Sequence, residues 1–260
     1  MKYIASYSGG KDSTATVILA HEHGEPLDLI IFAEVMFDET TSGELPEHID
    51  FIKHVAFPQF EAWGYECRIL HSGESYLDCF NRITTRSKVE ERNGRRYGFP
   101  MAGKCEIQKR CKIKAINRFF REEIKGERVQ YIGIAADEPK RLNRLTGTNK
   151  KSLLAKYNVT EAEAMTICKK YGLLSPSYKI AKRGGCWFCP NAKDQELRHL
   201  RKTWPELWRR LLELEEQPGL NGHIWNTLTK TSIHDKEKQF DLEDRQVTIW
   251  DLPGMKGEKW

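Results

Sequence analysis

A chain of 260 residues, of which 39% are hydrophobic and 30% charged, is long enough to form one α/β domain with an appendage. It has no apolar run of about 18 residues, and Met1 leads directly into an expected strand, so neither a membrane span nor a signal peptide is predicted. These features exclude an integral membrane protein and predict a cytoplasmic location. The formal net charge of +5 is mild but unevenly distributed.

The first expected element is a strand over residues 3–7, a short β-favouring run bounded by glycine. The sequence Ser-Gly-Gly-Lys-Asp-Ser at 8–13 follows it, and the next apolar run is expected to be a helix opened by Asp12 or Ser13, which are N-cap residue types. Strand, glycine turn and helix N-terminus form an anion cradle, because free N–H groups and the positive end of the helix dipole converge there. Lys11 adds a positive charge.

A nearly continuous apolar run at 28–35 is typical of a central parallel strand that is buried on both faces. With the preceding strand and helix it completes a βαβ unit, which predicts an α/β fold with a parallel sheet and helices on both faces. The polar segment 36–48 is expected either to contact a ligand or only to cap a helix over 49–63. A further strand is expected at 66–70.

A basic excursion over residues 75–103 carries the turn signals Asn93-Gly94 and Gly98-Phe99-Pro100 and is expected to lie near the active site. An amphipathic helix is predicted over 107–121, and another buried strand over 129–135. In open α/β sheets ligands bind beyond the carboxyl ends of strands, so the polar end of this last strand should share a crevice with the loop at 8–13.

Three predictions concern the later part of the chain. Capping boxes at Thr160–Glu163 and Thr203–Glu206 predict the starts of two helices. Residues 246–250 are expected to form a short strand. Basic residues gather in the segments 82–118 and 140–156, and clusters of this size predict a polyphosphate or nucleic-acid partner.

The seven cysteines are not interpreted as disulfides, because the chain is expected to be intracellular. Cys186-Trp-Phe-Cys189 follows two glycines, which is typical of a metal knuckle. Together with Cys105 and Cys111 it supplies four thiolates, enough for tetrahedral zinc or a four-iron cluster. We therefore predict a shared four-cysteine site and leave the metal open. A structural role is expected for the other three, Cys67, Cys79 and Cys168.

The stretch Ser8-Gly9-Gly10-Lys11-Asp12-Ser13 resembles the PP-loop of the ATP pyrophosphatase superfamily, which includes sulfonucleotide (PAPS) reductases, ATP sulfurylase and the tRNA and DNA thiolation enzymes. The pattern Gly-Ile-x-x-Asp-Glu-x-x-Arg at 133–141 resembles the second block of the sulfonucleotide-reductase branch. The segments 103–112 and 185–190 are similar to the cysteine segments of small PAPS-reductase-like proteins and of the DNA phosphorothioation enzyme. The resemblance covers roughly residues 1 to 200.

The resemblance implies an adenine nucleotide α-hydrolase-like, Rossmann-like fold that binds ATP with Mg²⁺, and a [4Fe-4S] cluster or zinc at the cysteines. Its implied nucleotide contacts are Ser8, Gly9, Gly10, Lys11, Asp12, Ser13, Glu34, Gly133, Asp137 and Glu138. The resemblance also implies three catalytic residues. Lys11 would stabilise the leaving pyrophosphate, Asp12 would position magnesium, and Arg141 would meet a phosphate. For Asp137 and Glu138, a purely helix-capping role is the alternative.

The expected domains are 1–175, which binds the nucleotide and carries a basic insertion at about 75–105, and 176–260, which holds the cysteine knuckle and a helical extension. The expected function is an adenylating ATP pyrophosphatase that activates an acceptor, such as a nucleic-acid base or backbone, for sulfur transfer. One alternative is a sulfonucleotide reductase, although the chain has no cysteine after Cys189 to match the C-terminal catalytic cysteine of those enzymes. The other is a zinc-pinned ATP-binding module of a larger complex.

Overall fold

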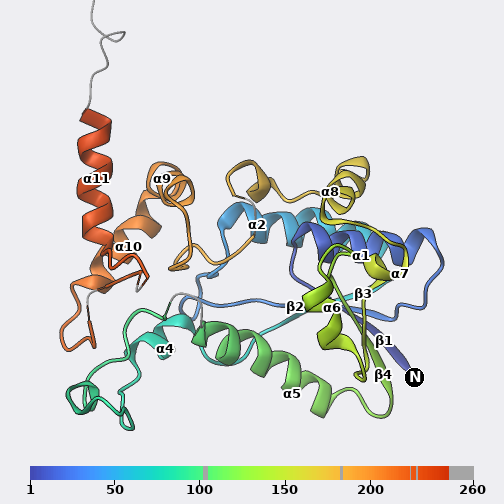
Figure 1. Ribbon diagram of the computed structural model, residues 1–260, viewed down its shortest axis with the longest axis horizontal. Coiled ribbons are helices and arrows are strands. Elements are labelled where there is room, and N and C mark those ends of the chain that lie inside the picture. Colours follow the sequence, from blue (N-terminus) through green and yellow to red (C-terminus); the bar gives the residue numbers. More distant parts are fainter. Residues whose placement is uncertain (102–104, 182–183, 223, 227, 246–260) are drawn as a thin grey trace, which may run out of the picture. The chain divides into compact units, whose positions relative to one another are not determined.

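The computed structural model describes residues 1–101, 105–181, 184–222, 224–226 and 228–245, and residues 246–250 of the expected last strand lie outside this range. The chain forms two compact units (Figure 1). The first comprises Met1–Asn81 and Cys105–Cys189, and the second comprises Arg82–Lys104 and Pro190–Trp260. This division differs from the predicted boundary at 175/176, because the cysteine knuckle belongs to the first unit and most of the basic insertion to the second.

The first unit is built on a five-stranded parallel sheet, as the βαβ pattern predicted. Its strands are β1 (Lys2–Tyr7), β2 (Leu29–Ala33), β3 (Glu66–Leu70), β4 (Arg128–Ile132) and β5 (Lys150–Lys151). Their order is β3-β2-β1-β4-β5, so the chain reverses its direction of winding at β1. In such sheets the carboxyl ends of the strands at this reversal form the ligand-binding crevice.

Helices cover both faces of the sheet, which confirms the α/β prediction (Figure 1). Alternate residues of each strand point to opposite faces: in β1, Tyr7 packs in the larger core and Ile4 in the smaller one. One face is covered by α1 (Lys11–Glu22), α2 (Pro46–Phe51), a π-helical turn (Ile52–Ala56), α3 (Phe57–Ala62), α7 (Leu153–Lys156) and α8 (Glu161–Lys170). The other face carries α5 (Lys114–Glu122), which continues a π-helical segment, Gln108–Ile113.

Four short helical elements complete the described part of the first unit. They are α4 (Tyr76–Asn81), α6 (Pro139–Leu142), and the 3₁₀ turns Asn143–Leu145 and Pro176–Lys179. The predicted capping box of Thr160 and Glu163 is confirmed at the start of α8. None of the described helices has the length and apolarity needed to cross a bilayer.

The second unit contains a 3₁₀ turn (Glu90–Arg92), α9 (Asp194–Thr203), α10 (Pro205–Glu215) and α11 (Ile233–Arg245). The buried Glu215 carboxylate accepts hydrogen bonds from the N–H groups of Ile233 (2.7 Å) and His234 (3.0 Å) and so caps α11. Capping by a carboxylate is favourable here because the helix N-terminus carries a partial positive charge.

Two predicted helix starts are wrong. Thr203 does not cap α10, because it is the last residue of α9, and α10 begins at Pro205 with its φ fixed by the ring. Likewise α1 begins at Lys11 with Gly10 as its N-cap, and neither Asp12 nor Ser13 caps it. The hydroxyl of Ser13 is instead used inside the preceding loop.

Candidate functional site

The loop at residues 8–13 joins β1 to α1 at the carboxyl end of the central strand. Ser13 Oγ accepts the Ser8 N–H (3.1 Å) and donates to the Gly10 carbonyl (2.9 Å), so the loop closes on itself. Gly9 has φ +72°, a conformation that glycine adopts without a steric penalty. No side chain caps α1 from Gly10; of the first helical N–H groups, that of Lys11 donates to the hydroxyl of Tyr178, which a ligand would have to replace.

A buried histidine supports the loop from beneath. The ring of His48 is 1% exposed; its Nε2 lies 2.9 Å from the Ser8 carbonyl oxygen and its Nδ1 lies 2.8 Å from Ser175 Oγ. Burial lowers the pKa of His48, although the Glu44 charge and the Ser8 carbonyl oppose this, so the ring is neutral and donates from Nε2. The imidazole thereby fixes the position of the Ser8 peptide.

Three glycines pack so closely that a side chain would collide with this arrangement. A Cβ on Gly9 would lie 2.6 Å from the His48 ring, and one on Gly184 would lie 2.7 Å from it. A Cβ on Gly133 would lie 2.6 Å from the Ser13 nitrogen, a backbone atom. Gly133, the residue after β4, therefore lies directly against the loop. This agrees with the prediction that the end of this strand and the loop at 8–13 lie together.

The side chains of Lys11 and Asp12 pair with each other. Lys11 Nζ lies 2.7 Å from Asp12 Oδ1 and 3.0 Å from Glu161 Oε1, a partner that sequence reasoning missed. Burial lowers the pKa of Lys11, but hydrogen bonds to the two carboxylates outweigh it, and the net pKa is raised. Burial raises the pKa of Asp12, and together with the charges of Glu161 and Glu138 it outweighs the lowering by Lys11. The ammonium group is thus held by carboxylates that a phosphate could replace.

A tyrosine hydroxyl stands at the start of α1. The Lys11 N–H donates to Tyr178 Oη at 2.8 Å, and a Cβ on Gly10 would lie 3.3 Å from the same oxygen. Burial raises the pKa of Tyr178, with the Lys11 N–H opposing, so the phenol is protonated at neutral pH. Tyr178 comes from the 3₁₀ turn 176–179, far from the loop in sequence, and no motif predicted its place.

The second predicted block, after β4, has a largely structural arrangement. Asp137 Oδ1 accepts the Glu161 N–H (3.1 Å) at the first turn of α8, which fits the helix-capping alternative. Glu138 accepts the Ala135 N–H (3.1 Å) and pairs with the half-exposed Arg141 (2.5 Å). Because Asp137 holds the backbone of Glu161, it also positions the carboxylate that reaches Lys11.

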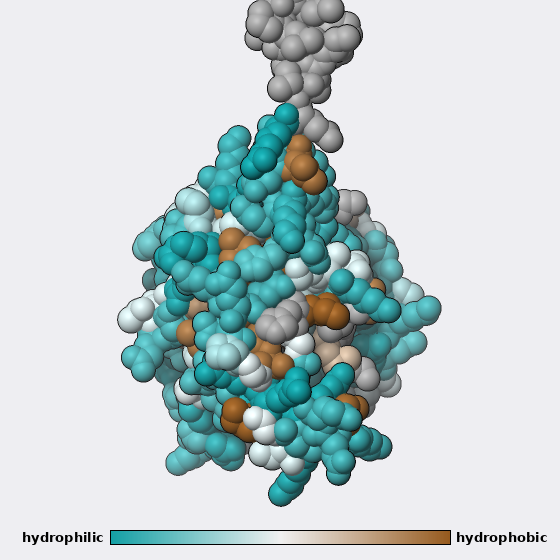
Figure 2. Space-filling model, turned by 90° about the vertical axis from the view of Figure 1, so that its left-hand side faces the viewer, coloured by the Kyte–Doolittle hydropathy of each residue, from teal (hydrophilic) through white to brown (hydrophobic). Residues whose placement is uncertain are grey.

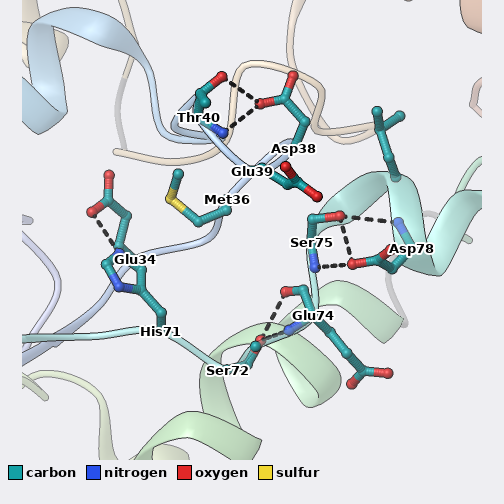
Figure 3. A pocket seen from close by; sticks show the side chains of 12 residues that line it. Glu34, Met36, Asp38, Glu39, Thr40, His71, Ser72, Glu74, Ser75 and Asp78 are labelled. Atoms are coloured by element: carbon teal, nitrogen blue, oxygen red, sulfur yellow. Dashed lines mark hydrogen bonds and ion pairs between the residues drawn. The ribbon is translucent and has the colours of Figure 1, made fainter.

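A cavity of about 730 Å³ lies at the carboxyl ends of β2 and β3, one strand away from the loop (Figure 3). Glu34 forms one wall, with its side chain 2% exposed and its carboxylate 3.1 Å from His71 Nε2 and 3.2 Å from Lys53 Nζ. Burial raises the pKa of Glu34. Hydrogen bonds from Ser42 and His71 and the charge of Lys53 lower the pKa by more, so the net pKa is lowered. Figure 3 shows Asp38, Glu74 and Asp78 on the other sides, so the cavity is predominantly acidic.

The four cysteines proposed as ligands are not all brought to one point. Cys186 and Cys189 lie in one turn, with the Cys189 N–H donating to the Cys186 carbonyl (3.1 Å). Burial raises the pKa of the Cys186 thiol, the Glu44 carboxylate adds to this effect and the Lys112 charge opposes it, and Cys189 and Cys105 raise the pKa further. Cys111 instead lies 4.0 Å from Cys79, sulfur to sulfur. Cys79 was expected to stand alone.

Within the described part of the chain, no set of three or more His, Cys, Asp or Glu side chains has the geometry to hold a metal ion. The residue types at Cys105, Cys186 and Cys189 suit a thiophilic metal, because thiolates are the donors that such a metal prefers. The hydroxyl of Tyr76 is fully buried and has no hydrogen-bond partner among the described residues. Burial raises its pKa, and the thiols of Cys186, Cys79, Cys105 and Cys189 raise it further. An orphaned donor among thiols is what an additional acceptor, such as a metal-bound sulfur, would satisfy.

An ion pair completes the surroundings of the thiols. Lys112 Nζ lies 2.7 Å from Glu44 Oε1; the Glu44 side chain is 1% exposed, and that of Lys112 is 29% exposed. Burial lowers the pKa of Lys112, but the charges of Glu44 and Cys186 outweigh this, so the ammonium form is favoured. Glu44 is also paired through its backbone with Cys186.

A basic helix face borders the acidic cavity. A hollow of about 460 Å³ is lined by Lys109, Arg110, Ile113, Lys114, Asn117, Arg118, Arg121 and Glu74. Glu74 lines both hollows and accepts from Arg110 (2.5 Å) and Lys114 (2.9 Å). The basic segment predicted around 82–118 is thus divided between this helix and the second unit.

No family model and no solved structure matches the chain. The chain is similar to the uncharacterized protein MJ0066 of Methanocaldococcus jannaschii, with 25% identity over 242 residues that cover 85% of the chain and 44% of the relative. The chain therefore spans less than half the length of this relative. The relative's name carries no activity, and the function proposed below rests on the residues of the chain itself.

Proposed function

We propose that the protein is an adenylating ATP pyrophosphatase that cleaves ATP between the α and β phosphates and activates an acceptor for sulfur transfer. The observation that carries this proposal is the uncapped loop at residues 8–13, held by His48 and Gly133 where the winding of the sheet reverses. Backbone N–H groups, a helix dipole and an ammonium group converge there, as binding of a pyrophosphate requires.

In this proposal Lys11 changes partners when the nucleotide binds. Without ligand its ammonium lies between the carboxylates of Asp12 and Glu161. A pyrophosphate at the start of α1 would draw the ammonium toward the β and γ phosphates, where it stabilises charge that builds on the leaving group. The released Asp12 carboxylate is then free to share a magnesium ion with the phosphates, since Mg²⁺ prefers carboxylate and phosphate oxygens.

The acidic cavity beside Glu34 is the proposed place of the adenosine and of the reacting acceptor. Neighbouring strands lie about 4.8 Å apart, so a cavity between the ends of β2 and β3 is within one nucleoside of the loop after β1. Carboxylates such as Glu39 can accept hydrogen bonds from ribose hydroxyls or from the exocyclic amine of adenine. The basic face of α5 next to it suits a polyanionic acceptor, which favours a nucleic acid.

The thiols of Cys105, Cys186 and Cys189 are proposed to hold a [4Fe-4S] cluster or zinc, with Cys111 as the fourth ligand if it leaves Cys79. A cluster would supply redox or sulfur chemistry, and zinc would supply only a structural link. The Tyr76 hydroxyl, buried among the thiols, can donate a hydrogen bond to a metal-bound sulfur. The Lys112 charge favours the ionised form of the Cys186 thiol, whereas burial and the Glu44 carboxylate oppose it and raise its pKa.

The proposal is tested by ATP binding and by exchange of labelled pyrophosphate into ATP. We expect the Ser8→Ala/Asp12→Ala double variant to lose both, because the loop loses a hydroxyl and the magnesium-positioning carboxylate. The matched control is Asp50→Ala, which removes a carboxylate that is exposed on α2 and bonded to His54. Binding of ATP that survives the double substitution would show that the loop does not hold the phosphates.

A sulfonucleotide reductase, the main alternative, would turn over a sulfonucleotide with a thiol reductant and release no pyrophosphate. Absorption and metal analysis of protein purified without oxygen separate the two roles of the thiols. A brown protein with about four irons per chain, lost in Cys186→Ser, supports sulfur or redox chemistry. A colourless protein with about one zinc makes the cysteines a structural clasp.

A further inference from the structure

The second unit contains a cavity of its own, of about 510 Å³, which the proposed ATP chemistry does not use. Its lining comes from the two chain segments that make up this unit. They contribute Thr84, Ser87, Arg92, Tyr97, Phe99 and Met101 from the first segment, and Asn221, Gly222 and Ile224 from the second. The volume lies within the range of small-molecule pockets and exceeds what packing defects leave.

Backbone hydrogen bonds join the chain segments that line this cavity. The Thr84 N–H donates to the Arg95 carbonyl (2.8 Å), and the Tyr97 N–H donates to the Arg82 carbonyl (2.8 Å). Arg96 joins the second chain segment, because its carbonyl accepts the Asn221 N–H at 3.0 Å. The cavity is thus a formed feature of the fold and does not depend on one loose loop.

The lining contains the aromatic ring of Tyr97 and the buried amide oxygen of Asn221. Tyr97 lies under the Arg82 guanidinium, 4.8 Å from its ring centroid, and the buried Phe99 follows it. The Nδ2 group of Asn221 donates to Thr84 Oγ1 (2.8 Å), while its Oδ1 is buried without a hydrogen-bond partner among the described residues. A planar ligand with an N–H group would satisfy both surfaces, by stacking on the ring and donating to the amide oxygen.

The chain segment that supplies most of the lining is strongly basic, and Arg92 is itself a lining residue; the exposed cations of this segment are called the rim cations below. Residues 82–101 include six basic and two acidic residues. Four exposed cations have no acidic partner among the described residues: Arg86, Lys88, Arg92 and Arg95. Figure 2 shows one face of the molecule, which is largely hydrophilic with small separate hydrophobic patches. The excess of basic over acidic residues in this segment suits a polyanion.

We propose that this cavity binds an unpaired base of a single-stranded nucleic acid, with the rim cations on the flanking phosphates. The four rim cations exceed what the single phosphate of a nucleoside monophosphate can neutralise, whereas a strand offers one phosphate per nucleotide along the segment. The base stacks on the ring of Tyr97 and donates a hydrogen bond to the amide oxygen of Asn221. Arg92 binds the phosphate backbone of the strand. The inference gives the second unit a role that is independent of the ATP site.

The test is fluorescence anisotropy of the full chain with a labelled single-stranded oligonucleotide, an abasic oligomer of equal charge, and a duplex. The abasic oligomer and the duplex should both bind about 10-fold or more weakly than the single strand, because neither offers a free base. Arg92→Ala should weaken binding to base-bearing and abasic strands alike, and lower the slope of log affinity against log salt by about one. The matched control is Arg209→Ala, which removes an exposed arginine of α10 that pairs with Glu213.

Equal affinity for the abasic and base-bearing strands would overturn the proposal, because the surface would then recognise charge alone. Tight binding of a mononucleotide that the strand does not displace would overturn it too, in favour of a small-molecule site. An unchanged circular dichroism spectrum shows that Arg92→Ala is folded. Because the measurements contain no ATP, they can succeed when the pyrophosphatase proposal fails, and the reverse.

Discussion

Replacing Gly9 by alanine tests the packing that holds the phosphate loop. Gly9 has φ +72°, and an added Cβ would lie 2.6 Å from the His48 ring and 2.7 Å from the Ile52 side chain. The ring cannot turn aside, because both of its nitrogens are hydrogen-bonded. Gly24, at the end of α1, has a similar φ of +60° but nothing within 4 Å of an added Cβ. The two glycines therefore separate backbone strain from collision.

The expected magnitudes follow from these two terms. An L-residue in the left-handed region costs about 1–2 kcal/mol, which applies to both Gly9→Ala and Gly24→Ala. Collision with a close-packed core adds about 1–3 kcal/mol, which applies to Gly9→Ala alone. The free energy of unfolding should thus fall by about 1–2 kcal/mol in Gly24→Ala and by about 2–5 kcal/mol in Gly9→Ala. A unit of this size loses roughly 2–4 °C of Tm per kcal/mol.

Thermal and urea unfolding of both variants measures the difference, and titration with ATP measures the consequence for the loop. We expect Gly9→Ala to bind ATP at least about 10-fold more weakly, because the Ser8 and Gly9 peptides must move away from His48. Gly24→Ala should bind ATP like the parent protein. Equal losses of stability in the two variants would refute the reasoning, since the His48 contact would then carry no cost.

Three further predictions concern buried polar groups of the first unit. Tyr178→Phe should lower the free energy of unfolding by about 0.5–1.5 kcal/mol, because the hydrogen bond from the Lys11 N–H is lost. The same change should raise the affinity for pyrophosphate in calorimetry, because this N–H no longer has a competing acceptor. Tyr171→Phe, which removes a surface hydroxyl bonded to Glu22, is the control. Lys112→Met should lower the free energy of unfolding by about 3–5 kcal/mol, because it leaves the buried Glu44 carboxylate unpaired. Glu44→Gln should lower it by less, because the Lys112 ammonium can reach water. Equal losses in urea unfolding would contradict this asymmetry. Because burial holds the pKa of His48 below its ordinary value of about 6.5, the folded state resists protonation, so stability is complete above that pH and is lost as the pH falls below it. His48→Gln should remove this part of the pH dependence of unfolding, and an unchanged pH profile would count against a neutral imidazole.

The fold class could be predicted from the sequence because its signals are local. The run Asp28–Val35 is apolar at nearly every position since β2 is buried on both faces, and the glycines of the loop mark the turn after β1. The place of Gly133 beside the loop followed from a general property of parallel sheets, namely that their carboxyl ends meet at one edge.

The partners within the site could not be predicted in the same way. His48, Glu161 and Tyr178 reach the loop from segments that are distant in sequence, and only the packing of the helices against the sheet brings them there. The cap of α1 was mispredicted because Ser13, a typical N-cap residue, bonds to Ser8 and Gly10 inside the loop. A capping residue in a sequence identifies a hydrogen-bonding group, but the structure decides which backbone group it serves.

The second unit is made of two pieces of chain that are separated by much of the first, and this has a consequence for synthesis on the ribosome. Arg96 acquires its partners at Gly219 and Asn221 only after more than one hundred further residues have been made. At about 5–20 residues per second, this interval lasts roughly 6–25 s. During that time the first unit can assemble its sheet, while the arginine-rich segment has not yet met the residues near 219–221 that complete its fold. A nascent chain of this protein therefore presents a basic, unpaired segment beside the ribosome's own RNA before the segment is folded.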